Sequence, residues 1–315
     1  MRTVRIARLS PGLRLLLAGL VVPACWALAT CHREAATGRV YDSPEHAAEA
    51  LVSTVTKGTI DDLIAILGPD SRDLIDSADV PDARQSREVF AAAAKERWRL
   101  EDGANGTKTL VIGNEDWPFP IPLVHTSNGW LFDTASGKDE VIARRVGRNE
   151  LDVIEVCRTY VGAQHLYAAS GHDGQPAGGF AMVFRSDAGR QNGLYWPVAR
   201  RQRPSPLGDL VAEAAEQGRR LANTPPTPFH GYYFRILTAQ GAAAPGGAKD
   251  YVAGGRMTGG FALVAWPSVY DSTGVMTFIV GSDGIVRETD LGPDSATAAA
   301  GMRAFNPDAS WSPVQ

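Results

Sequence analysis

The chain has 315 residues, with 31 lysines and arginines against 35 aspartates and glutamates, and a formal charge of −4. An acidic chain whose longest basic runs are Arg144-Arg145 and Arg200-Arg201 is a poor match for nucleic acid, so no nucleic-acid partner is expected. The apolar fraction of 44% excludes bulk disorder, and the length leaves room for two globular domains.

Residues 1–30 have the pattern of a bacterial export signal. Four arginines, at positions 2, 5, 8 and 14, precede the apolar run 15–22, and no acidic residue occurs before Glu34. Cleavage removes these four arginines and takes the formal charge from −4 to −8. The apolar run is shorter than the roughly 20 residues of a membrane-spanning helix, and Pro23 interrupts the segment, so an uncleaved anchor is not expected.

The segment Leu28-Ala29-Thr30-Cys31 resembles a bacterial lipoprotein box. The resemblance implies that Cys31 is lipidated and becomes the new N-terminus, followed by a tether over residues 31–41. The expected location is then the periplasm or the outer membrane, with the lipid as the sole membrane contact. Thr30 departs from the small residues usual before that cysteine. The alternative is ordinary cleavage after Ala29, which yields a secreted soluble protein.

Residues 42–140 are predicted to form a first domain of the α+β class. Ser43 and Pro44 begin a helix that Gly58 ends, and Gly68-Pro69 stops a second helix over 60–67. A short helical turn is expected at 71–77, and a longer helix over 83–99 with Val89, Phe90, Ala93 and Trp98 inward. The period then changes, and strands are expected at 109–112, 120–124 and 129–133. Helices followed by antiparallel hairpins resemble the nuclear-transport-factor-2 (NTF2) folds.

Residues 141–315 are predicted to form a second α+β domain that begins with a long helix. This helix spans 137–169, with a kink expected at Gly147, and carries two adjacent apolar stripes. The stripes consist of Leu151, Ile154, Cys157 and Val161, and of Val153, Val156, Tyr160, Ala163 and Tyr167. A further helix is expected at 210–220. Strands at 232–238, 261–266, 275–280 and 285–289 form an antiparallel meander, with a turn at 282–284. This order resembles the globular heads of pilins and pseudopilins.

Several longer motifs, each different from the others, are spread along the chain from about residue 41 to its end. They include Asp116-Trp117-Pro118-Phe119-Pro120, Gly193-Leu194-Tyr195-Trp196-Pro197, His230-Gly231-Tyr232-Tyr233-Phe234-Arg235 and Gly260-Phe261-Ala262-Leu263-Val264-Ala265-Trp266-Pro267. In these segments the chain resembles a bacterial envelope family, domain of unknown function 2950. The resemblance implies membership of that family and no activity.

Motifs of catalysis and cofactor binding are missing from the sequence. The histidines lack the spacing of a metal site, so no metal is expected. No G-x-S-x-G nucleophile elbow occurs, and Gly247 stands where a phosphate loop needs lysine. Cys157 lies within a helical pattern and is interpreted as a packing residue. We therefore expect no cofactor, and we favour a protein that is not an enzyme over an enzyme.

Two clusters remain as candidate binding residues. Arg144, Arg145 and Arg148, with Glu150, are expected either to form a salt-bridge network between the two domains or to bind an anionic ligand. The rings of Trp117, Phe119, Tyr195 and Trp196 lie beside prolines. They are expected either to cap the edge of a core or to form a binding surface.

These patterns favour an exported envelope protein that acts as a binding or assembly module with an envelope protein as its partner. One alternative is a periplasmic hydrolase of cell-wall or glycan substrates, in which folding brings two acids together. The other is an accessory of a secretion system, because of the pilin-like pattern. No pattern in the sequence indicates whether the protein is a monomer or an oligomer.

Overall fold

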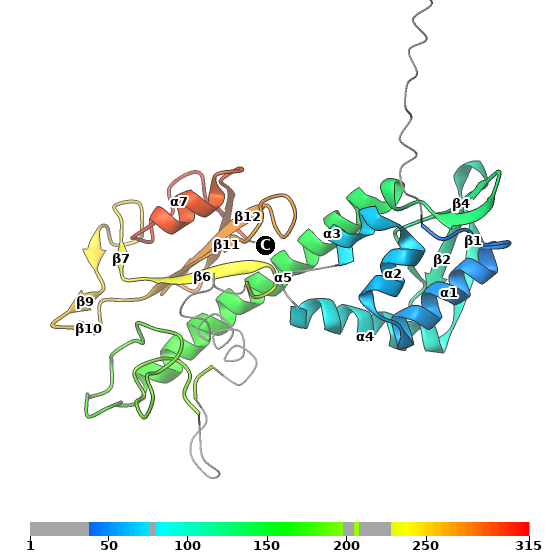
Figure 1. The fold of residues 1–315 in the computed structure, drawn as a ribbon. Coiled ribbons are helices and arrows are strands. Elements are labelled where there is room, and N and C mark those ends of the chain that lie inside the picture. The colour runs from blue at the N-terminus through cyan, green and yellow to red at the C-terminus, as the bar shows by residue number, and fades with distance from the viewer. Residues whose placement is uncertain (1–37, 76–79, 198–204, 208–227, 315) are drawn as a thin grey trace, which may run out of the picture. The chain divides into compact units, whose positions relative to one another are not determined.

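The computed structural model describes residues 38–75, 80–197, 205–207 and 228–314 (Figure 1). Helices and antiparallel sheets alternate along these ranges, so the chain is of the α+β class, as predicted. The export signal, Cys31 and the helix expected at 210–220 lie outside the described residues, and those three assignments stay predictions.

The first two helices begin and end where local signals place them. In α1 (Pro44–Lys57) the Ser43 side chain accepts the His46 N–H at 3.2 Å, and the Gly58 N–H closes the last turn on Thr54. In α2 (Ile60–Leu67) Thr59 and Asp62 form a reciprocal capping box. The short helices η1 (Pro69–Ser71) and α3 (Arg72–Ile75) follow, and then α4 (Val80–Glu96).

A five-stranded antiparallel sheet packs against these helices. Its strands are β1 (Trp98–Asp102), β2 (Lys108–Ile112), β3 (Trp117–Pro118), β4 (Leu123–Thr126) and β5 (Gly129–Phe132). The order is β1-β2-β4-β5, and β3 pairs with β2. Gly129, the first residue of β5, directly follows the turn of the β4–β5 hairpin and has a φ of 126°, which a side chain would oppose. Between the sheet and the helices lies a core that includes Leu51, Leu110 and Leu123, each at most 1% exposed.

Two predictions at α4 are wrong. Trp98 is the first residue of β1, not the last turn of the helix, because its strand pairs with β2 along five residues. Val89 is 62% exposed, whereas Phe90 and Ala93 pack against the core. Phe90 and Ala93 are three residues apart and share a helix face, and Val89 lies about 100° away from Phe90.

The long helix α5 (Thr134–Ala168) runs as one element through Gly147, so the expected kink is absent from it. The Asp133 side chain accepts the Ser136 N–H at 3.2 Å and caps its start. Val141 packs against the first core, and Val153 and the buried residues that follow belong to a second one. Leu151 is 70% exposed, so its place in the predicted stripe is wrong, whereas Ile154 and Cys157 of the same stripe are buried and Val161 packs against the second core.

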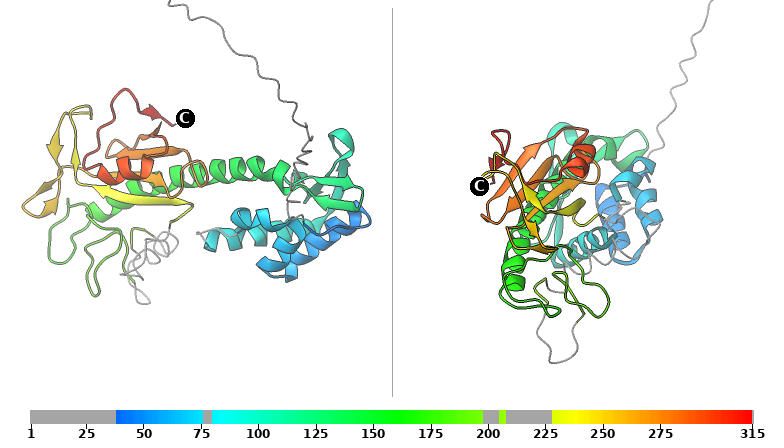
Figure 2. Two further views of the ribbon diagram at one scale, coloured as in Figure 1. Left: turned by 45° about the horizontal axis from the view of Figure 1, so that its top comes forward. Right: turned by 90° about the vertical axis from the view of Figure 1, so that its left-hand side faces the viewer.

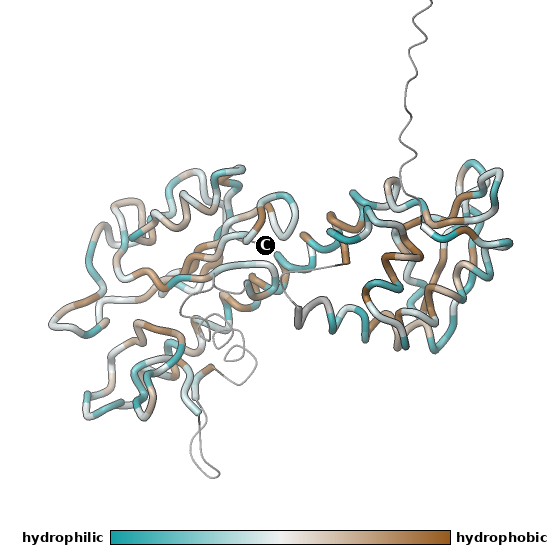
Figure 3. The backbone as a smooth tube through the Cα atoms, in the orientation of Figure 1, coloured by the Kyte–Doolittle hydropathy of each residue, from teal (hydrophilic) through white to brown (hydrophobic). Residues whose placement is uncertain are grey.

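The second sheet is an antiparallel meander, as predicted, extended by one strand. It comprises β6 (Tyr232–Leu237), β11 (Ala262–Pro267), β12 (Met276–Gly281), β13 (Val286–Asp290) and β14 (Ser312–Pro313). The order is β14-β13-β12-β11-β6. Hydrophobic residues recur along its central strands (Figure 3), where Val264 pairs with Ile279 and both are fully buried. Two ribbons flank the sheet: β7 (Ala239–Gln240) with β8 (Lys249–Asp250), and β9 (Val252–Ala253) with β10 (Arg256–Met257).

Helices α5 and α7 (Ser295–Gly301) cover opposite faces of this sheet (Figure 2). Tyr232 at the start of β6 points toward Glu150 of α5, and Arg235, three residues on, donates to carbonyls at the end of α7. Residues an odd number apart on a strand face opposite sides, so the second core has a layer of helix on each side. The division into two domains near residue 140 and the likeness to NTF2 and pilin folds stay predictions.

Candidate functional site

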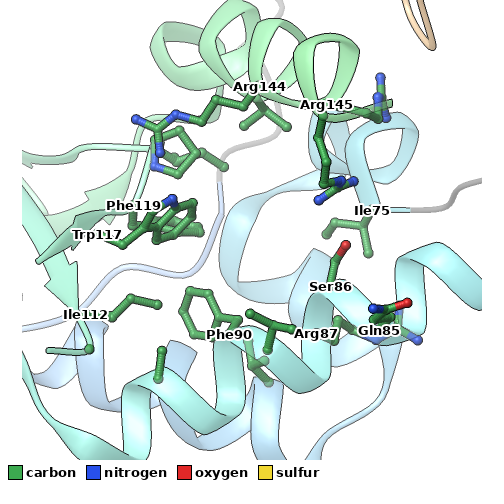
Figure 4. Close-up of a pocket in the computed structure, with 18 of the residues that line it drawn as sticks. Ile75, Gln85, Ser86, Arg87, Phe90, Ile112, Trp117, Phe119, Arg144 and Arg145 are labelled. Carbon is green, nitrogen blue, oxygen red and sulfur yellow. The ribbon is translucent and has the colours of Figure 1, made fainter. Parts of the chain in front are cut away.

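A pocket of about 920 Å³ opens beside the first core, between α4, the β2–β3 region and α5 (Figure 4). Residues of α1, α2 and α3 also line it. The volume lies within the ~300–1,000 Å³ typical of small-molecule sites. Five of the seven residues predicted from the sequence line this one pocket: Trp117, Phe119, Arg144, Arg145 and Arg148.

One wall of the pocket is aromatic. Phe90 of α4 lies 6.3 Å from Trp117 and 5.7 Å from Phe119, both in edge-to-face geometry. Phe119 also contacts Phe132 of the core at 5.8 Å, which anchors the wall from behind. Trp117 is 39% exposed, so the wall reaches solvent at its outer edge. Edge-to-face pairs of this kind hold ring positions in addition to burying area.

The depth of the pocket is aliphatic. Its lining includes Leu51, Leu63, Leu67, Ile112 and Ile121, whose side chains are at most 6% exposed. These side chains belong to the first core, so the pocket reaches into it. Ser71 also lines the pocket, and its hydroxyl donates to the Gly68 carbonyl at 2.6 Å. A polar group of a ligand would therefore find few partners at this depth.

Arg144 lies on the α5 side of the pocket, over the aromatic wall. Its Nε bonds Glu140 one turn earlier at 2.6 Å, and its Nη1 donates to the Pro118 carbonyl at 2.7 Å. The guanidinium carbon lies 5.1 Å from the centre of the Trp117 ring. These contacts hold a cation at the boundary between the ring and the opening, which is a cation–π arrangement.

The other members of the arginine cluster have different surroundings. Arg145 donates to the carbonyl and the hydroxyl of Ser272 at 3.0 and 3.1 Å, across 127 residues of sequence. Arg148 lines the pocket. Glu150 is turned toward the second sheet, where it accepts the N–H groups of Val275 and Met276 at 2.9 and 3.0 Å. Arg145 and Glu150 therefore join α5 to the segment around β12 by hydrogen bonds, and the three arginines border a cavity. The salt-bridge network between domains and the anionic ligand stay predictions.

Sequence reasoning missed a pair of titratable groups in the same lining. Nδ1 of His230 lies 3.2 Å from Oδ2 of Asp152, without the geometry of a hydrogen bond. His230 has a φ of 48°, which is uncommon for a residue with a side chain. The two residues are far apart in the sequence, and no local motif joins them.

Tyr195 and Trp196 lie elsewhere. Trp196 is 7% exposed and belongs to the second core, where its ring lies 5.4 Å from His172 and 6.5 Å from Tyr167. Tyr195 is half-buried against the same core, and the Arg185 guanidinium lies 5.7 Å from its ring. Of the two interpretations of the rings, a core edge describes Trp196, and the four rings do not form one surface.

Neither a metal cluster nor a reactive thiol occurs in the ranges that the structure describes. No group of three metal-ligating side chains converges there. Cys157 is fully buried, and burial raises the pKa of its thiol to about 12. The thiol is therefore protonated at neutral pH and lies in the core as a packing residue.

The family assignment rests on the sequence model of a family described as "Protein of unknown function (DUF2950)", which matches residues 38–314. Neither the curated proteins nor the solved structures contain a significant match. Among the described residues, no helix has the length and the apolar composition needed to cross a membrane. Because the match covers nearly all of the described chain, the protein belongs to the DUF2950 family.

Proposed function

We propose that this protein is an exported binding module of the cell envelope and that the pocket beside α5 is its binding site. The observation that carries the proposal is an open cavity of about 920 Å³ in contact with a buried aliphatic core. Protein interiors are close-packed, and unfilled apolar volume lowers stability. A cavity of this size therefore favours an occupant over a packing defect.

A neutral fluorescent probe, N-phenyl-1-naphthylamine, tests whether the pocket binds apolar molecules. One probe per chain is expected to bind, with an increase in fluorescence. Val89 of α4 is 62% exposed and lines the pocket, so Val89→Trp adds a ring to this lining without changing the core. This variant is expected to weaken probe binding at least tenfold.

The control is Ala298→Trp, which adds the same ring to an exposed position of α7. It is expected to bind the probe as the native protein does. Equal binding by both variants, or the absence of saturable binding by the native protein, would reject the pocket as the site.

The envelope location and the protein partner are further parts of the proposal. The location is supported by the sequence pattern of residues 1–31, with lipidation at Cys31. A protein partner is supported by the exposed edge of Trp117, since aromatic anchors at the rim of an apolar pocket are typical of interfaces. Trp117→Ala is expected to reduce binding of such a partner without unfolding the protein.

A periplasmic hydrolase is the second candidate, and the Asp152–His230 pair favours it. A carboxylate beside an imidazole can orient a general base. The two side chains line the pocket, where a substrate could reach them. Turnover of cell-wall fragments that Asp152→Asn abolishes would support this candidate over the binding module. The absence of turnover by the native protein would exclude these substrates.

A further inference from the structure

The geometry points to a specific occupant of the pocket: a single-chain amphiphile with an anionic head group, a carboxylate or a phosphate. The inference rests on the proposed function and specifies its ligand class. The apolar chain lies against the aliphatic depth, and the head group lies at the α5 side beside Arg144.

The deep part of the pocket favours an apolar chain. Leu51, Leu63 and Leu67 present buried hydrocarbon to the cavity, and the hydroxyl of Ser71 already has a partner. An uncharged chain loses nothing there, whereas a sugar or a peptide backbone would leave hydrogen-bonding groups unpaired. Each additional methylene that enters is expected to tighten binding about fourfold, from ~0.8 kcal/mol per buried methylene.

The side of the pocket that α5 forms favours a negatively charged head group. Arg144 uses Nε and Nη1 for its contacts with Glu140 and Pro118, and among the described residues nothing bonds its Nη2. Arg145 and Arg148 lie one and four residues further along the same helix and also line the pocket. Three guanidinium groups over little more than one helical turn favour an anion, because guanidinium matches carboxylate and phosphate in geometry.

Acidic residues of the lining do not cancel this preference. Glu96 accepts the Asn114 N–H at 3.1 Å, and Asp152 faces His230 at 3.2 Å. Glu115 also lines the pocket, so the lining holds three carboxylates against four arginines, the fourth being Arg87 of α4. Of these arginines, three lie on α5, where the head group is placed, and Figure 4 shows two of them, Arg144 and Arg145.

The test is displacement of N-phenyl-1-naphthylamine by four ligands with the same ten-carbon chain: decanoate, decyl phosphate, decanol and decyltrimethylammonium. Decanoate or decyl phosphate is expected to compete at least tenfold better than decanol, and the cation worst. A charge-assisted hydrogen bond of this kind is worth about one order of magnitude or more. The better of the two anions identifies the head group. Octanoate should compete about 15-fold less well than decanoate.

Arg144→Gln should remove most of the advantage of the anions while leaving the affinity for decanol unchanged. Arg144→Lys should keep a large part of the advantage, because it retains the charge. The matched control is Arg158→Gln, at an exposed position of α5 outside the pocket lining. Melting curves of all variants verify that they are folded.

The outcomes separate the two levels of the proposal. Decanol competing as well as decanoate, or Arg144→Gln keeping the full preference for anions, would overturn the head-group inference and leave the apolar pocket in place. Failure of every ligand to compete, together with unchanged probe binding by Val89→Trp, would reject the pocket itself.

Discussion

Gln164 of α5 is expected to be one of the most sensitive positions of the second core. Its side chain is fully buried, with Nε2 donating to the Ala181 carbonyl at 2.8 Å and to the Tyr160 hydroxyl at 3.0 Å. Its Oε1 accepts the Ala181 N–H at 2.9 Å. This one amide therefore satisfies both backbone groups of a residue that is itself fully buried.

Replacing Gln164 by methionine keeps the length of the side chain and removes all three hydrogen bonds. Tyr160 retains its bond to the Ala262 carbonyl at 3.1 Å, so the loss falls on the two groups of Ala181. Each stranded buried group costs about 1–3 kcal/mol. Burial of the apolar methionine offsets about 1–2 kcal/mol of this. The middle of these ranges, about 4 kcal/mol for the two groups less about 1.5 kcal/mol for the methionine, gives a net decrease in the free energy of unfolding of about 2.5 kcal/mol.

Urea unfolding followed by circular dichroism measures this difference. The midpoint should fall while the slope stays constant, since the surface exposed on unfolding is the same. Thr159→Met is the control, an exposed position of the same helix, and should change stability by less than about 0.5 kcal/mol. A loss as small as this in Gln164→Met would show that Ala181 finds other partners, and the argument from stranded groups would be refuted.

Three further predictions concern titration, reactivity and processing. Burial and the nearby Glu150 raise the pKa of Glu288, so folding takes up a proton and stability falls as pH rises from the ordinary value of 4.5 through the raised pKa. Glu288→Gln should remove this fall and raise the melting temperature at pH 7, seen in melting curves across pH. A lower melting temperature at pH 7 would contradict it. Cys157 should resist iodoacetamide in the native protein and react in urea, because its thiol is buried with a pKa of about 12. Mass spectrometry detects the adduct. Rapid labelling of the native protein would contradict the burial of Cys157 in the core. Intact mass spectrometry of envelope-purified protein should show an acylated N-terminus at Cys31, and a start at residue 30 without acyl mass would leave plain secretion.

Much of the secondary structure could be predicted because its signals are local. The caps at Ser43 and Gly58 and the capping box of Thr59 act over three or four residues, and they set the bounds of α1 and α2. Alternating apolar runs similarly predicted β11 to β13. Strand β1 was missed because its residues follow a helical pattern without a break. Only pairing with β2 makes them a strand.

The candidate site could be predicted only in part. Trp117 and Arg144 stood out by residue type, but their contact joins a strand and a helix that are 27 positions apart and have no common motif. Trp196 has the same ring-and-proline pattern as Trp117, yet one is buried in a core and the other lines a pocket. Composition does not distinguish these two outcomes, because both bury apolar area.

By itself, the sequence determined the export pattern, the α+β class, the family and the limits of the early helices, since these depend on composition or on neighbours within a turn or two. The tertiary structure alone decided which polar groups meet. Glu150 caps the start of β12 from 125 residues away, and Asp152 faces His230. It also decided that the space between α4 and α5 stays open. Such outcomes depend on how whole elements pack, because the volume and burial of a site are sums over side chains that no local pattern relates.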